Sequence, residues 1–215
     1  MNSWTILIIA AILALTGSAQ ASDEKALFKS NFEVASVDSV PEELMVLGGG
    51  FSVKEIDGNK LLELPGDPLE DFGALFGPTE PDGIAVRARV YSESSKRLAP
   101  RFGVGLNGVA GYRLLVTPGQ NRLQLLRDQE ALASAPFEWK SSTWTSLHLQ
   151  VRKMSEGNWV IEGRAWADGT SEPKEWSISF EVSETPPAGK ASIWGAPYSG
   201  KPILFDDLSV TSLVP

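Results

Sequence analysis

Turn-forming residues divide this chain of 215 residues at short and regular intervals. Glycine permits a positive φ and proline presets φ at about −65°, so clusters of these two residues mark the places where the chain reverses. Between the clusters lie runs of strand length, and no segment keeps a helical apolar period over three turns. The turn sequences are Gly48-Gly49-Gly50, Asp57-Gly58, Pro65-Gly66-Asp67-Pro68, Gly77-Pro78, Pro81-Asp82-Gly83, Asn107-Gly108, Pro118-Gly119, Asp168-Gly169 and Pro186-Pro187. This spacing predicts an all-β protein built as a sandwich or a barrel.

Several of the runs alternate apolar and polar residues, which is the pattern of a strand with one buried face. In the run 84–91, Ile84 and Val86 point to one side and Arg87 points to the other. Residues 112–117 and 122–127 flank a Pro-Gly turn and are expected to form a hairpin. The clearest alternating runs are 84–91, 147–152 and 159–166. The polar faces of these strands predict a sandwich with one curved sheet face open to solvent.

Helical signal is scarce, and no linker, repeat or low-complexity tract divides the chain. The stretches 25–28, 67–72 and 128–133 are each compatible with one or two helical turns. We therefore expect a single β-sandwich domain over residues 22–215, a length that such domains commonly reach undivided.

The N-terminus carries the pattern of a secretory signal peptide. An apolar run over 6–15 is followed by the small-residue site Ala19-Gln20-Ala21, so residues 1–21 are predicted to be the signal peptide. The run is shorter than the roughly 20 apolar residues that a membrane-spanning helix needs. The alternative is a short amphipathic or buried helix. The signal peptide predicts a secreted or periplasmic protein.

Composition excludes several classes of site. The chain has no cysteine, which rules out disulfides, thiolate metal sites and cysteine nucleophiles. It has a single histidine, His148, which rules out any site that needs two imidazoles. The formal net charge of −8 argues against nucleic acid as the main partner.

A set of motifs spread over nearly the whole mature chain resembles a known superfamily. They are Asn31-Phe32-Glu33, the run 49–55, the run 58–64, the run 111–116, Trp144 ahead of 147–151, and the final run 205–210. Their order resembles the concanavalin A-like lectin/glucanase superfamily, particularly its secreted laminin-G-like and keto-disaccharide hydrolase-like jelly rolls. The resemblance implies a two-sheet antiparallel jelly-roll sandwich, with adjacent first and last strands and a role in sugar binding.

Catalysis does not follow from this resemblance. Laminarinase-like relatives carry a Glu-x-Asp-x-x-Glu strand, whereas here Glu55-Ile56-Asp57-Gly58 runs into a turn and Lys60 stands at the position of the second glutamate. We therefore expect a non-catalytic, lectin-like carbohydrate-binding module. The alternatives are a glycoside hydrolase or polysaccharide lyase with catalytic groups on several strands, or an envelope protein-interaction module.

The outward positions of the alternating strands provide the candidate ligand face. Aromatic rings stack on the C–H faces of sugars, and polar side chains fix the hydroxyl groups. The candidate binding residues are Arg87, Arg89, Tyr91, Asn107, His148, Gln150, Glu162, Arg164 and Trp166. A face rich in arginine would suit an acidic or sulfated polysaccharide. The alternative is an ordinary solvated face on which arginine and glutamate pair across strands. The remaining tryptophans of the mature chain are expected to fill the core or cap its ends: Trp139, Trp144, Trp159, Trp176 and Trp194.

An acidic pair interrupts the closing strand. Strand alternation sends one of Asp206 and Asp207 to solvent and the other inward or to the sheet rim. The pair is a candidate for a structural calcium ion, which prefers carboxylate and carbonyl oxygens. The alternative is that one aspartate accepts hydrogen bonds from backbone or arginine. The sequence requires no cofactor.

Overall fold

Fifteen strands and one short 3-10 helix make up residues 25–213, the part of the chain that the computed structural model describes. The predicted signal peptide, residues 1–21, lies outside the described residues. The strands are β1 (Lys25–Ser30), β2 (Met45–Val46), β3 (Ser52–Ile56), β4 (Asn59–Leu64), β5 (Phe72–Glu80), β6 (Ile84–Ser92), β7 (Arg101–Leu106), β8 (Tyr112–Thr117), β9 (Arg122–Arg127), β10 (Glu130–Pro136), β11 (Thr145–Lys153), β12 (Trp159–Ala167), β13 (Ile178–Val182), β14 (Gly189–Ala196) and β15 (Ile203–Ser212).

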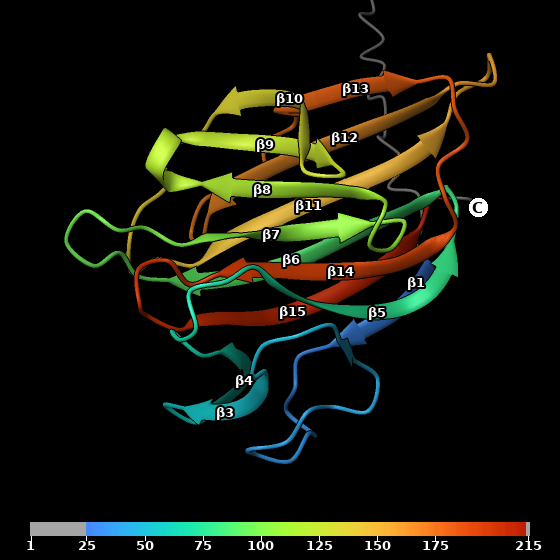
Figure 1. Cartoon of the computed structure of the whole chain (residues 1–215). Helices are drawn as coiled ribbons and strands as arrows, with labels where there is room; N and C mark the ends of the chain where they lie inside the picture. The colour runs from blue at the N-terminus through green and yellow to red at the C-terminus, as the bar shows by residue number, and fades with distance from the viewer. Residues whose placement is uncertain (1–24, 214–215) are drawn as a thin grey trace, which may run out of the picture.

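The strands form two antiparallel sheets that lie face to face (Figure 1). The eight-stranded sheet has the order β13-β12-β11-β6-β15-β4-β3, with β1 also paired to β15. The seven-stranded sheet has the order β10-β9-β8-β7-β14-β5-β2. The all-β jelly-roll prediction is confirmed, as is the expected pairing of the first and last strands.

The sequence-predicted hairpin is also present, because β8 and β9 pair through a 3-10 turn over 118–120. The expected helical turns were wrong. Residues 25–28 belong to β1, while 67–72 and 128–133 lead into β5 and β10. A single helical turn is marginal in water, whereas the ladders of the two sheets pair the backbone groups of these strands.

The closing strand β15 has two different partners along one edge. Residues 203–205 pair with β4, and residues 208–212 pair with β1. A β-bulge separates the two halves, since the register against β6 shifts between Asp206 and Ser209 and Asp207 has φ of 50°. The acidic pair therefore marks the point at which the neighbouring strand changes.

The core lies between the sheets and uses the predicted apolar parity. Val86 and Val90 of β6 are fully buried, as are Val104 of β7 and Leu114 of β8. Beyond the core, the segment ahead of β2 covers the outer edge of β3, where the amide of Asp38 donates to the carbonyl of Val53 over 2.8 Å. This contact protects an edge strand that would otherwise be open to pairing with another chain.

Gly163 of β12 allows the two sheets to approach closely. A Cβ built at this position would lie 2.6 Å from a methyl carbon of Leu114, which is fully buried. We expect Gly163→Ala to lower the free energy of unfolding by about 2 kcal/mol, because a packed core absorbs an added methyl poorly. Urea unfolding measures this loss. Gly119→Ala is the control, since nothing lies within 4 Å of its Cβ; equal losses in the two variants would contradict the packing account.

Candidate functional site

A hollow of about 560 Å³ opens on the outer face of the eight-stranded sheet. Its volume lies within the range of ligand pockets, roughly 300–1,000 Å³. We call it the groove. It is lined by Ile56, Asp57, Asn59, Leu61, Glu63, Tyr91, Glu93, Trp144, Lys201, Pro202 and Leu204. These residues come from β3, β4, β6, β15 and the segments next to them, so the sheet itself forms the floor.

The floor of the groove is set by the β3–β4 hairpin. Asp57 and Gly58 form its two-residue turn with φ of 53° and 82°, the left-handed conformations that short hairpins favour. Leu61 of β4 and Leu204 of β15 face the groove, although both are almost fully buried. Apolar side chains on the outward side of a sheet make the floor suitable for the apolar face of a ligand.

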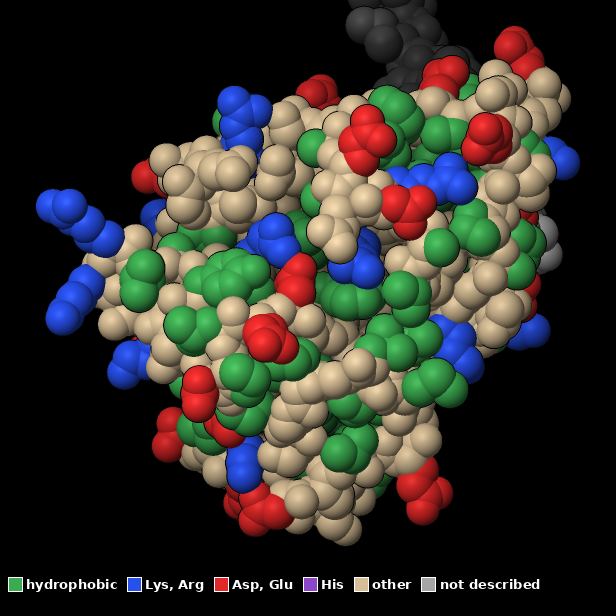
Figure 2. All heavy atoms as spheres, viewed as in Figure 1, with side chains coloured by type: hydrophobic (Ala, Val, Ile, Leu, Met, Phe, Trp, Pro, Cys, Tyr) green, Lys and Arg blue, Asp and Glu red, His purple; other side chains and the backbone are tan. Residues whose placement is uncertain are grey.

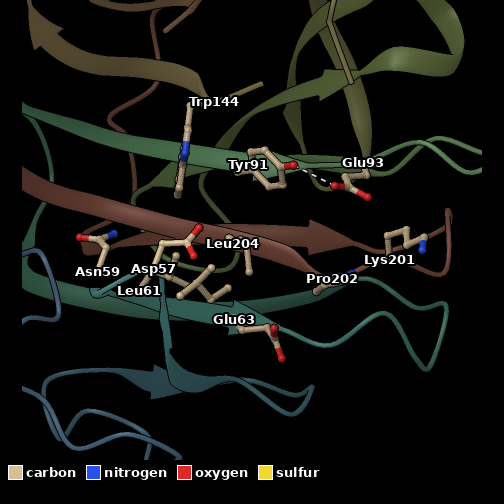
Figure 3. A pocket seen from close by; sticks show the side chains of 11 residues that line it. Asp57, Asn59, Leu61, Glu63, Tyr91, Glu93, Trp144, Lys201, Pro202 and Leu204 are labelled. Carbon is tan, nitrogen blue, oxygen red and sulfur yellow. Dashed lines mark hydrogen bonds between the residues drawn. The ribbon is translucent and has the colours of Figure 1, made fainter. Parts of the chain in front are cut away.

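Two aromatic rings form the opposite wall (Figure 3). The ring centroids of Tyr91 and Trp144 lie 5.7 Å apart with an interplanar angle of 52°, a favourable geometry for an aromatic pair. The Tyr91 hydroxyl donates to Glu93 over 2.8 Å. This hydrogen bond, with partial burial, raises the pKa of Tyr91 above its ordinary value. Tyr91 is therefore a fixed hydrogen-bond donor with its ring beside the groove.

Arg89 holds the aromatic wall in place. Its guanidinium bonds Asp168 and Asp207, each over 2.9 Å, and its central carbon lies 4.8 Å from the centroid of the Trp144 ring. This cation–π contact joins Trp144 to the eight-stranded sheet. Arg89 lies on the outward side as predicted, but its charge is used within the protein.

The acidic pair lies at the bulge in β15. One carboxylate lies inward and the other faces solvent, as expected: Asp206 is 5% exposed, whereas the Asp207 side chain is 50% exposed. Asp206 is buried beside Asn59, whose side-chain amide donates to it over 3.1 Å, and Asp207 meets Arg89. Burial is the largest influence on Asp206 and raises the pKa of its carboxyl above the usual range, while the bond from Asn59 lowers it.

Both carboxylates of the calcium candidate already bond within the protein. Residues 25–213 contain no group of three or more histidine, cysteine or acidic side chains that could hold a metal. The carboxylate of Asp207 already accepts from a guanidinium, which a cation would have to displace. No step of the proposed function uses calcium.

The connection between β12 and β13, residues 168–177, covers much of the predicted ligand face. Its Glu172 carboxylate bonds Arg87 over 2.6 Å, Arg164 over 2.5 Å and the Nδ1 atom of His148 over 2.8 Å. The Trp176 ring lies 4.8 Å from the His148 ring. The expectation of an open, solvated face at these positions was therefore wrong.

His148 is buried and electrically neutral under this connection. Its side chain is 2% exposed. Burial, followed by the positive charge of Arg87, lowers the pKa of His148 from 6.5 to about 4. The pKa of Glu172 is lowered despite its burial, because Arg87 and His148 both donate to it. This cluster anchors the connection to the outer face of the eight-stranded sheet.

The other predicted face residues also bond within the protein or lie elsewhere. Gln150 donates to Glu162 over 2.7 Å, and both side chains are buried. Asn107 follows β7 in the seven-stranded sheet, where its buried amide donates to the carbonyl of Pro81 over 2.6 Å. Asn107 is thus not on the face with the other candidates. Trp166 is partly exposed on β12, and Tyr91 is the one candidate among the groove residues.

The tryptophan prediction was right in part. Trp159 belongs to the core between the sheets, and Trp139 packs against this core. Trp194 is buried on the outer side of the seven-stranded sheet, with the Arg113 guanidinium carbon 3.3 Å from its ring centroid. Trp176 and Trp144 likewise lie outside the core, on the outer face of the eight-stranded sheet.

Two signals in the sequence could have located the groove. Leu204 sits between Ile203 and Phe205, so strict alternation places an apolar side chain on the outer face, and Leu61 does the same beside Leu62. Apolar residues that gather at outward positions, as Leu61 and Leu204 do, indicate a surface that something covers. Neither signal identifies Trp144, which comes to the groove from the segment before β11.

The rest of the surface offers smaller or more mixed features. Charged side chains of both signs alternate with apolar ones over the side seen in Figure 2. A second hollow, of about 420 Å³, lies beside Lys29 and Asp207, and a third, of about 90 Å³, lies beside Arg101 and Arg113. The described part of the chain contains no helix with the length and apolarity that a membrane crossing needs.

Comparison with known proteins supports the fold and leaves the activity open. No protein-family model matches the sequence, and no curated protein is similar to it. The carbohydrate-binding module CBM66 from Bacillus subtilis matches the structure with a TM-score of 0.57 and 10% identity, over 79% of this chain and 96% of that one.

Two other solved structures match over most of their length. The marine PL-14 alginate lyase from Aplysia kurodai has a TM-score of 0.54 and 11% identity, covering 87% of this chain and 99% of the lyase. The metal-free carbohydrate recognition domain of Emp46p has a TM-score of 0.55 and 11% identity, covering 86% of this chain and 94% of that domain. The fold is thus that of the concanavalin A-like jelly rolls, which carbohydrate-binding modules, lectins and polysaccharide-degrading enzymes share.

Proposed function

We propose that this protein binds a glycan in the groove without transforming it, as an exported lectin-like module. The observation that carries the proposal is the pair of rings, Tyr91 and Trp144, on the wall of a hollow with an apolar floor. A pyranose ring has apolar C–H faces and a polar rim, so it suits a site with rings on one side and polar groups around them.

The polar groups of the groove complement hydroxyl groups. Asp57, Glu63 and Glu93 supply carboxylate acceptors, and Asn59 and Lys201 supply donors. These side chains lie around the leucine floor and the two rings (Figure 3). The site could thus hold a sugar by stacking and fix its orientation through hydrogen bonds.

Enzymatic hydrolysis is the second candidate, since the groove contains three carboxylates. A glycosidase needs two carboxyl groups about 5 to 9.5 Å apart on either side of the scissile bond. A lyase with a tyrosinate base would need a lowered pKa, whereas the pKa of Tyr91 is raised. Release of reducing ends from a bound oligosaccharide would establish the enzymatic alternative and overturn the non-catalytic proposal.

Replacing the larger ring tests the proposal. We expect Trp144→Ala to weaken binding of a neutral oligosaccharide by at least tenfold, which corresponds to about 1.4 kcal/mol. Loss of the stacking surface is the physical reason. The ligand is found on a glycan array, and affinity is then measured by isothermal titration calorimetry. Unchanged affinity in the folded variant would remove the groove as the binding site.

A matched variant separates the ring from its hydroxyl group. Tyr91→Phe keeps the ring and removes the donor to Glu93, so its affinity should stay within about threefold of the original protein. The melting temperature of each variant shows whether the fold survives, because Trp144 also contacts Arg89.

A further inference from the structure

The arginines on the outer face of the eight-stranded sheet are already paired with carboxylates of the protein. Arg87 and Arg164 meet Glu172, while Arg89 meets two aspartates. Arg152 bonds Glu162 over 3.0 Å. An acidic polysaccharide would have to compete with these intramolecular carboxylates, so the sequence-based expectation of an anionic ligand loses its physical basis.

The groove has the opposite balance of charge. Its lining contains Asp57, Glu63 and Glu93, against the single cation Lys201. Among residues 25–213, none of these three carboxylates has a lysine or arginine nitrogen within 4 Å. The nearby Lys54 is bonded to Asp38 over 2.5 Å. The groove therefore has an excess of negative charge.

The aromatic wall favours the same class of ligand. The faces of tryptophan and tyrosine rings attract ammonium groups by about 0.5–1 kcal/mol at exposed sites. A concave surface lined by one sign of charge also concentrates ligands of the opposite sign. The hollow and its rings define the site, and the carboxylates select the charge of what enters it.

We propose that the groove recognises a glycan with free amino groups, such as an oligomer of glucosamine residues. This inference rests on the proposed function, because it specifies the ligand of the same groove. The sugar ring lies against Tyr91 and Trp144, and its protonated amine lies among the carboxylates of Asp57, Glu63 and Glu93.

Calorimetry with three matched oligosaccharides tests the inference. The probes are a glucosamine oligomer, its fully N-acetylated form and a uronic acid oligomer of equal length, in mildly acidic buffer that keeps the amines protonated. We expect the glucosamine oligomer to bind roughly tenfold tighter than the acetylated one. Two exposed ion pairs between its amines and the carboxylates of the groove would together give a gain in affinity of this size. Added salt should shrink this difference, since exposed charges are screened. The uronic acid oligomer should bind most weakly.

Single charge removals connect the preference to the groove. Glu63→Gln and Glu93→Gln should each weaken binding of the glucosamine oligomer by about threefold to fivefold and leave the acetylated oligomer nearly unchanged. Glu156→Gln is the matched control. Glu156 is exposed in the turn after β11, at the far end of that strand from Trp144. The Glu156→Gln variant therefore removes the same charge without touching the groove.

The outcomes distinguish this inference from the function on which it depends. Equal binding of the glucosamine and acetylated oligomers would overturn the amino-sugar inference and leave glycan binding intact. Failure of every glycan would overturn both. An oligolysine peptide of the same charge controls for general attraction to an acidic protein. If its binding shows the same loss with Glu63→Gln, charge alone explains the preference and the inference falls.

Discussion

Glu172→Ala is expected to lower the free energy of unfolding by about 3 kcal/mol, the lower end of the range for breaking a buried ion pair. The Glu172 carboxylate is the shared acceptor for Arg87, Arg164 and His148. Its removal leaves two guanidinium groups without a counter-charge, and the Arg164 side chain is only 12% exposed. We expect a loss at the lower end of this range because the Glu172 side chain is itself 28% exposed.

Urea unfolding at neutral pH measures this loss. Glu175→Ala is the control in the same connection, because Glu175 is exposed and forms no salt bridge among the described residues. It should cost less than about 0.5 kcal/mol. A loss below about 1 kcal/mol for Glu172→Ala would mean that water replaces the carboxylate and that the cluster does not anchor the connection.

Stability is expected to fall as the pH drops from about 6.5 to about 4, with His148 contributing about 3 kcal/mol of the loss. The pKa of His148 is lowered in the folded protein, from 6.5 to about 4. Between these values the unfolded chain binds a proton that the folded chain does not. Acid therefore favours the unfolded state, and this contribution is complete below the folded pKa. Arg87 and Arg164 face His148 with positive charge, while Glu172 bonds it from the connection.

A non-titrating variant isolates this contribution. His148→Gln keeps a side-chain amide that can donate to Glu172, but it has no proton to gain over this range. The difference in unfolding free energy between neutral pH and the acid end should be smaller in the variant by about 3 kcal/mol. Identical pH dependence in the two proteins would contradict the buried, neutral state of His148. Glu172, whose pKa is lowered, remains in both proteins, so its own acid loss largely cancels.

Periodicity predicted the fold because it follows from local rules. Turn residues set the strand ends, and alternation placed Val86 and Val90 in the core and Arg87 and Arg89 outside it. Strand alternation can indicate the face of a sheet to which a side chain points. It carries no information about what lies over that face, so the cover that residues 168–177 place on His148 could not be predicted.

Two further features lie outside strand periodicity, one at the groove and one at the bulge in β15. Trp144 reaches the groove from a segment between strands, where the direction of a side chain follows from tertiary contacts such as that with Arg89. The bulge at Asp207 shifts the register of β15 against β6, which a strict period of two does not predict. Its position reflects the change of partner from β4 to β1, which involves strands far apart in the sequence.

The place of β15 has a consequence for biosynthesis. This strand joins β6 on one side to β4 and β1 on the other, so three earlier strands lack a neighbour until residues 203–212 have left the ribosome. The eight-stranded sheet cannot be completed before these residues have been synthesised. Closure is consequently a late, long-range event, of the kind that slows folding and leaves unpaired edges exposed to other nascent chains in the meantime.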